Sequence, residues 1–155
     1  SYYKEIWDNV VTNIQFNQGY IHGLGDDISI VDRFFVGGSN LRGFKSGGIG
    51  PRDVLTDDAL GGNMYYTGTA QIKFPLSRDS DLPVKGLLFS QIGSLTMIDL
   101  SGNNLSDIGS PRVSVGIGTS WQTPVGPLRI DYSEAVKKQS FDKTQKIYFS
   151  FGTRF

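Results

Sequence analysis

The sequence offers few side chains for acid–base, nucleophilic or metal chemistry. Its 155 residues contain no cysteine and one histidine, His22. Disulfides, thiolate metal sites and cysteine nucleophiles are therefore excluded, and a single imidazole argues against a His-based metal site or a Ser-His-Asp triad. Asp53, Asp57 and Asp58 carry the carboxylates that calcium prefers, but we interpret them as a solvated acidic loop, and His22 as a polar loop residue. We expect no enzyme, metal or cofactor.

The most unusual charged group is Arg42, because it lies in an apolar and glycine-rich stretch. Residues 33–51 read RFFVGGSNLRGFKSGGIGP, with six glycines and two arginines. They belong to a link of about 39 residues, 24–62, and a link of that length is usually functional or disordered. Phe34, Phe35, Leu41 and Phe44 argue against disorder, and the glycines allow sharp turns and close approach.

Alternation of apolar and polar residues predicts the elements that must position this loop. The segment RVSVGIGTSWQT alternates without a slip, with Val113, Val115 and Ile117 on one face and Arg112 and Ser114 on the other. KIYFSFGTRF at the end of the sequence does the same. Six strands are expected in all: Val10–Phe16, Met64–Phe74, Val84–Met97, Arg112–Thr123, Leu128–Val136 and Lys146–Phe155. The chain is thus predicted to be all-β.

The net charge and the lengths of the links between strands narrow the class of protein. Fifteen basic and fifteen acidic residues cancel, which argues against nucleic acid as a partner. No stretch approaches the roughly 20 apolar residues of a membrane helix. The links LSRDSDLP and TPVGP are short, whereas those at about 24–62, 99–111 and 137–145 are long. Short turns at one end and long loops at the other are typical of an antiparallel up-and-down meander, and outer-membrane barrels have this asymmetry.

Periodicity alone does not decide whether the apolar face points to a soluble core or to lipid. A chain that ends on a strand, with Phe155 last, favours the outer-membrane interpretation, because termini of soluble domains usually fray. Six strands fall below the minimum of about eight for a membrane barrel, and an open sheet would expose two edges to lipid. We therefore expect the closing piece of a larger transmembrane barrel.

Several ordered motifs resemble the BamA family, which assembles β-barrels in bacterial outer membranes. FFVGGSNLRGF followed by KSGGIGP is similar to the sixth external loop of that family, whose hallmark tetrapeptide matches Leu41, Arg42, Gly43 and Phe44. DALGGNMYYTG, SVGIGTSWQTPVGPLRIDYS and the terminal FSFGTRF resemble the strands that follow. The resemblance covers almost the whole chain. It implies a 16-stranded barrel behind periplasmic POTRA domains, with residues 1–155 as its last six strands and no POTRA domain in this chain.

The resemblance also implies where the loop goes. In the family the loop folds back into the barrel lumen and its arginine docks on the inner wall, where carboxylates usually face it. The matching positions here are Lys73 and Gln91, with Asp131 or the backbone as alternative acceptors and Phe89 on the same wall. Lys73 would repel Arg42, which departs from the family pattern. The closing-strand signal falls on Ile147, Phe149, Phe151, Gly152 and Phe155.

Three functions are compatible with these observations. The first is insertion of nascent outer-membrane β-barrel proteins through a lateral seam in the outer membrane, with lipids and accessory assembly lipoproteins as further partners. The second is a translocation pore of the two-partner-secretion or patatin-linked type, which shares the loop motif. The third is a soluble lipocalin-like binder. The DALGGN stretch favours the first.

Overall fold

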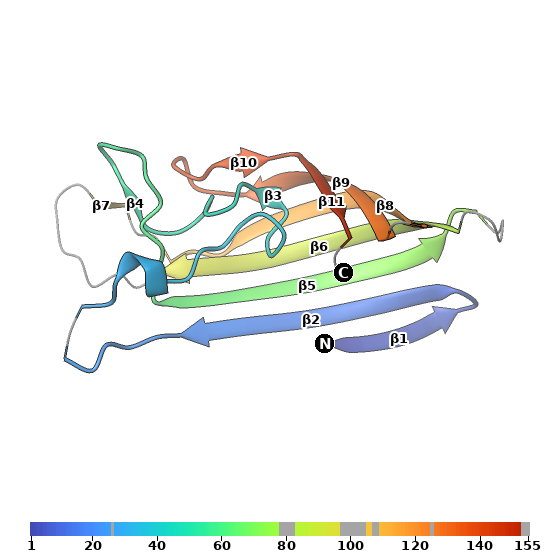
Figure 1. The fold of residues 1–155 in the computed structure, drawn as a ribbon, viewed down its shortest axis with the longest axis horizontal. Coiled ribbons are helices and arrows are strands. Elements are labelled where there is room, and N and C mark those ends of the chain that lie inside the picture. The colour runs from blue at the N-terminus through green and yellow to red at the C-terminus, as the bar shows by residue number, and fades with distance from the viewer. Residues whose placement is uncertain (26, 78–82, 97–104, 107–108, 125, 153–155) are drawn as a thin grey trace.

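The computed structural model describes residues 1–25, 27–77, 83–96, 105–106, 109–124 and 126–152. Its principal element is a sheet of seven strands in which each strand pairs antiparallel with the next one along the sheet (Figure 1). The strands are, in sheet order, β1 (Tyr2–Trp7), β2 (Val10–Tyr20), β5 (Met64–Pro75), β6 (Val84–Thr96), β8 (Arg112–Thr123), β9 (Gly126–Lys137) and β11 (Ile147–Phe151). The sheet order follows the chain order, so the predicted meander is confirmed.

Six of these strands match the predicted ones, and the count of six was wrong because β1 adds a seventh. The segment YYKEIW places apolar and charged residues on both faces, so alternation does not reveal it. The segment forms a strand because it pairs with β2, where Tyr2 lies opposite Ile14 and Tyr3 opposite Asn13. The strand expected from Lys146 begins instead at Ile147 and ends at Phe151. The expected strand positions 153–155 lie outside the described residues.

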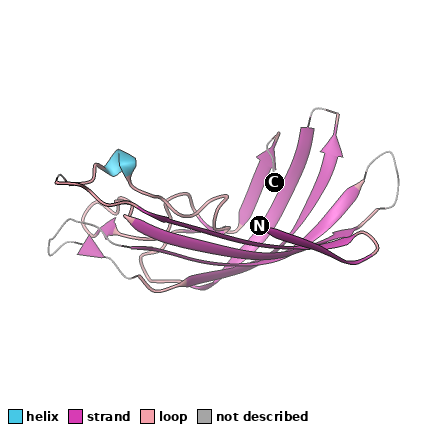
Figure 2. Ribbon diagram, turned by 90° about the horizontal axis from the view of Figure 1, so that it is seen from below, coloured by secondary structure: helices cyan, strands magenta, loops and turns pink. Residues whose placement is uncertain are grey.

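The sheet is curled but open, with β1 and β11 at its two edges (Figure 2). Short connections join β1 to β2, β5 to β6 and β8 to β9, and the long links lie at the other end of the strands. No helix within the described ranges is long and apolar enough to cross a membrane.

The two faces of the sheet differ in chemistry as alternation predicts. The convex face carries large apolar side chains that are exposed, among them Ile14, Phe16, Ile72, Leu88, Val115, Ile117, Phe149 and Phe151. The concave face carries polar side chains that are covered. Arg112 and Ser114 are fully buried there, although an arginine is almost never fully buried unless paired. An apolar outer face around a polar interior is the arrangement of a membrane barrel wall.

What covers the concave face is the long loop. This loop contains a 3-10 helix, η1 (Ile30–Asp32), and two short strands, β3 (Gly43–Phe44) and β4 (Arg52–Asp53), which agrees with the expectation that it is not disordered. β3 pairs with β10 (Thr144–Gln145), and β4 pairs with β7 (Leu105–Ser106). The hydrophobic core cluster packs the loop residues Val36, Leu41, Phe44 and Ile49 against Leu95 of β6. The loop is therefore an integral part of the fold.

Candidate functional site: the docked arginine loop

The backbone at Gly43 aims the arginine of the loop at the sheet. Gly43 has a φ of +97°, a conformation that L side chains rarely adopt, and a Cβ there would lie 2.9 Å from the Cβ of Ser114. On either side, Leu41 and Phe44 are fully buried in the core. Burying side chains of this size contributes about 1.5–3 kcal/mol each. The two apolar anchors and the glycine between them fix Arg42 against the wall.

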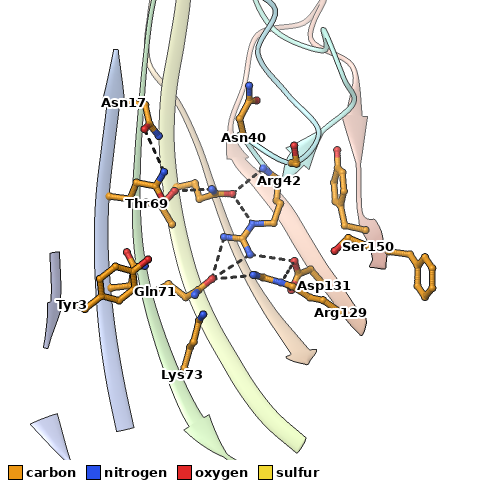
Figure 3. Close-up of a pocket in the computed structure, with 16 residues that line it drawn as sticks. Tyr3, Asn17, Asn40, Arg42, Thr69, Gln71, Lys73, Arg129, Asp131 and Ser150 are labelled. Carbon is orange, nitrogen blue, oxygen red and sulfur yellow. Dashed lines mark hydrogen bonds and ion pairs between the residues drawn. The ribbon is translucent and has the colours of Figure 1, made fainter. Parts of the chain in front are cut away.

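Arg42 is held by hydrogen bonds from both its backbone and its side chain (Figure 3). The Oε1 atom of Gln91 accepts the backbone N–H of Arg42 at 2.8 Å and its Nε at 3.0 Å. The guanidinium lies 3.2 Å from the Asp131 carboxylate, and its Cζ lies 3.5 Å from the ring centroid of Phe89. A desolvated cation over an aromatic face gains about 2 kcal/mol. The site thus recognises both the charge and the plane of the guanidinium.

A second arginine shares the same carboxylate. Arg129 donates from Nε to both oxygens of Asp131, at 2.9 and 2.8 Å. Gln71 accepts from both guanidinium groups through one oxygen, at 3.1 Å from Arg129 and 3.5 Å from Arg42. All four side chains are buried. Two cations therefore share one anion in a region screened from water, which makes Asp131 the electrostatic centre of the site.

The structure brings three of the four predicted wall residues to Arg42: Phe89, Gln91 and Asp131. Lys73 lines the same cavity of about 720 Å³, but among the described contacts none joins it to Arg42 (Figure 3). Gln71, one inward-facing position earlier on β5, supplies the acceptor instead. Sequence reasoning missed Gln71 and Arg129. The signal for Arg129 was present, because it shares a strand face with Asp131 two residues on.

The residues of the expected closing signal divide between the outer face and the strand end. Ile147, Phe149 and Phe151 are exposed on the convex face of β11. Gly152 follows the end of the strand with a φ of +71°, and its N–H donates to the Pro127 carbonyl at 2.9 Å. Phe155 lies outside the described residues.

A second buried ion pair holds the last long loop to the sheet. Arg112 of β8 contacts the Asp142 carboxylate through two nitrogens, at 3.0 and 3.1 Å, and both side chains are fully buried. Asp142 also accepts the backbone N–H of Gln139 at 2.7 Å. A bidentate arginine–carboxylate pair is among the stronger hydrogen-bonded arrangements. It fixes the start of the segment that leads into β10 and β11.

The acidic cluster of the long loop has partners within the protein. Asp53 accepts the backbone N–H groups of Thr56 and Leu55, and these bonds lower the pKa of its carboxyl. Asp57 accepts a hydrogen bond from the Lys143 ammonium, which lowers its pKa, and lies 3.7 Å from Arg52. Across the described residues, no three His, Cys, Asp or Glu side chains gather as a metal site requires.

The fold and the docked loop define a class of protein: an apolar-faced antiparallel meander whose interior holds an arginine loop. The same fold is found in the crystal structure of BamA from Haemophilus ducreyi lacking POTRA domains 1–3, with a TM-score of 0.79 and 24% sequence identity. That likeness covers 91% of this chain and 31% of the other. The Omp85 superfamily domain matches residues 1–155. The chain belongs to the Omp85 superfamily.

Its relatives include a BamA protein and a SAM50-like protein. It is 36% identical over 148 residues to the outer membrane protein assembly factor BamA of Neorickettsia risticii, covering 95% of this chain and 20% of the relative. It is 32% identical over 144 residues to a SAM50-like protein of Schizosaccharomyces pombe, covering 88% and 30%. The chain thus spans about a fifth to a third of the length of these relatives.

Proposed function

We propose that residues 1–155 are the C-terminal part of the barrel of an outer-membrane assembly factor that inserts nascent outer-membrane β-barrel proteins. The observation that carries this proposal is the docked loop: Leu41 and Phe44 in the core, and Arg42 bound to Gln91 and Asp131. The relatives named as BamA support it. The complete barrel has 16 strands, follows POTRA domains and lies in the bacterial outer membrane.

The mechanism requires no covalent chemistry. β11 lies at an edge of the sheet and presents unpaired backbone groups, which a strand of a client protein can extend by β-augmentation. The seam lies where this strand meets the first strand of the complete barrel. Outer-membrane lipids and accessory assembly lipoproteins are the further partners. The docked loop stays in the lumen while the seam opens.

The test is to reconstitute the full-length protein in liposomes and to measure the rate at which an unfolded model barrel protein acquires its folded, heat-modifiable form. Acceleration by the wild type, and its loss in Arg42→Ala, is the expected result. A matched control is Arg33→Ala, because the hydrogen bonds described for Arg33 go to the loop carbonyls of Ile28 and Leu60 and not to the sheet. If the wild type secretes a passenger and does not speed barrel folding, the assignment to assembly is wrong.

A further inference from the structure

The closing strand contacts the arginine loop through one tyrosine. Tyr148 lies in β11 opposite Asp131, so its side chain is on the concave face. Its hydroxyl donates a hydrogen bond to the backbone carbonyl of Phe44, which lies 104 residues away in the loop motif. The same carbonyl accepts the N–H of Gly38 at 2.9 Å. The carbonyl oxygen of Phe44 therefore accepts one hydrogen bond from within the loop and one from β11.

The residues just before β11 are bonded to the loop as well. Thr144 and Gln145 pair with Phe44 and Gly43. The N–H of Lys45 donates to the Lys143 carbonyl at 2.9 Å, and the N–H of Lys143 donates to Gly48 at 2.8 Å. The segment 143–145 is thus connected by backbone hydrogen bonds to residues 43–48, and only Lys146 separates it from β11.

The other end of this segment is fixed by the buried Arg112–Asp142 pair. β11 itself has a weaker hold on the sheet. It contributes five residues, all paired with β9, whereas β9 and β8 pair over eleven positions. A strand with a short ladder on one side gains a larger share of its positional stability from contacts outside the ladder. For β11 these contacts lead to the loop.

We propose that Tyr148 is a positioning residue that couples docking of the Leu41–Phe44 motif to the position of the closing strand. When Arg42 leaves Gln91 and Asp131, Phe44 moves and β11 loses its anchor on the concave side. When β11 shifts, the motif loses the hydroxyl of Tyr148. Such a coupling free energy is reciprocal by thermodynamic necessity. The inference rests on the proposed function, in which β11 borders the seam.

The experiment is amide hydrogen exchange of the full-length protein in detergent micelles or nanodiscs, read over residues 43–48 and 147–151. Three variants are compared with the wild type. Tyr148→Phe removes only the hydroxyl, Arg42→Ala releases the loop from the wall, and Ser150→Ala alters the next concave-face position of β11 as a control. Heat-modifiable gel mobility verifies that each variant is a folded barrel.

Both Tyr148→Phe and Arg42→Ala are expected to raise exchange in both segments. The expected increase for Tyr148→Phe is about two- to tenfold, the range of one net hydrogen bond. Ser150→Ala should change neither segment. If Arg42→Ala frees residues 43–48 while 147–151 exchange as in the wild type, or if Tyr148→Phe affects β11 alone, the coupling is overturned. Hydrogen exchange is measured without a client protein, so it does not depend on assembly activity. A wild type that fails to accelerate barrel folding would refute the proposed function, but the exchange data would still test the coupling.

Discussion

Arg42 and Asp131 lie 89 residues apart in the chain, and their side chains meet at 3.2 Å inside the curled sheet. Asp131 simultaneously accepts two bonds from Arg129. The loop is therefore docked on a wall that already carries a paired arginine, and the two cations depend on one carboxylate.

Removing the shared carboxylate should cost more than removing any single hydrogen bond of the site. Asp131→Asn removes the carboxylate that the guanidinium groups of Arg42 and Arg129 both contact, and breaking a buried pair costs about 3–5 kcal/mol. The measurement is denaturant unfolding of the full-length protein in micelles. Glu134→Gln is the control, because Glu134 lies on the same strand but is exposed. Equal losses for both variants would contradict a central role for Asp131.

Adding a second carboxylate should stabilise the docked loop. Gln71 accepts from both Arg42 and Arg129, so Gln71→Glu places a negative charge between two cations. The gain should be present at neutral pH, where the glutamate is ionised, and should disappear as the pH falls below about 4. Protease resistance of the loop as a function of pH measures it. Gln15→Glu, which lines the cavity elsewhere, is the matched variant, and an equal effect there would refute the site-specific explanation.

Gly43→Ala should release the loop from the sheet for two reasons: a steric clash with Ser114 and backbone strain at Gly43. The added Cβ would lie 2.9 Å from the Cβ of Ser114, in a backbone conformation with a φ of +97°. Gly25→Ala separates the two effects, because Gly25 has a φ of +113° and open space around it. We expect loss of assembly activity and faster loop proteolysis for Gly43→Ala only. Comparable damage from Gly25→Ala would show that strain alone explains the effect.

The orientation of the sheet predicts on which face an arginine substitution destabilises the protein in a membrane. Ile14 is exposed on the convex face, and its neighbour Gln15 faces the cavity. Ile14→Arg should destabilise the folded barrel by about 2–4 kcal/mol if it lies near the bilayer midplane, and Gln15→Arg should cost clearly less. Urea unfolding in lipid vesicles measures both. A larger loss for Gln15→Arg would invert the assigned faces.

Ser114 alternates with the apolar positions of β8, but it is not a suitable partner for this comparison. Ser114 is fully buried and lies beneath Gly43. An arginine there would displace the loop, so its cost would not report on lipid.

The 155-residue chain by itself should not accelerate barrel folding. Its sheet leaves β1 and β11 as open edges, whose backbone groups lipid cannot satisfy. We expect aggregation or association through these edges. Refolding in detergent, followed by a mass measurement and a folding assay with a model barrel, tests this. A discrete active monomer would show that no further strands are required.

The sequence determined much of the architecture because a sheet with two chemically different faces has a period of two in its sequence. That period located six strands and put Val115 and Ile117 on one face and Ser114 on the other. The terminal Phe155 and the family resemblance, not the period, favoured lipid on the apolar side. Composition indicated that the loop is ordered, since a stretch with Phe34, Leu41 and Phe44 gains from burial, and the family resemblance implied that it folds inward. The family resemblance added the docking role of Arg42, with Phe89, Gln91 and Asp131 on the wall.

Only the tertiary structure decided which groups meet. Tyr2–Trp7 became a strand because β2 offers it a partner, not because its own pattern alternates. Gln71 faces Arg42 at the place expected for Lys73. The reason is the register of the paired strands, which determines which inward side chain lies opposite the loop. The contacts of Tyr148 with Phe44 and of Arg112 with Asp142 depend on the same long-range register. Alternation tells on which face a side chain lies, but its neighbours on that face are fixed only when the strands pair.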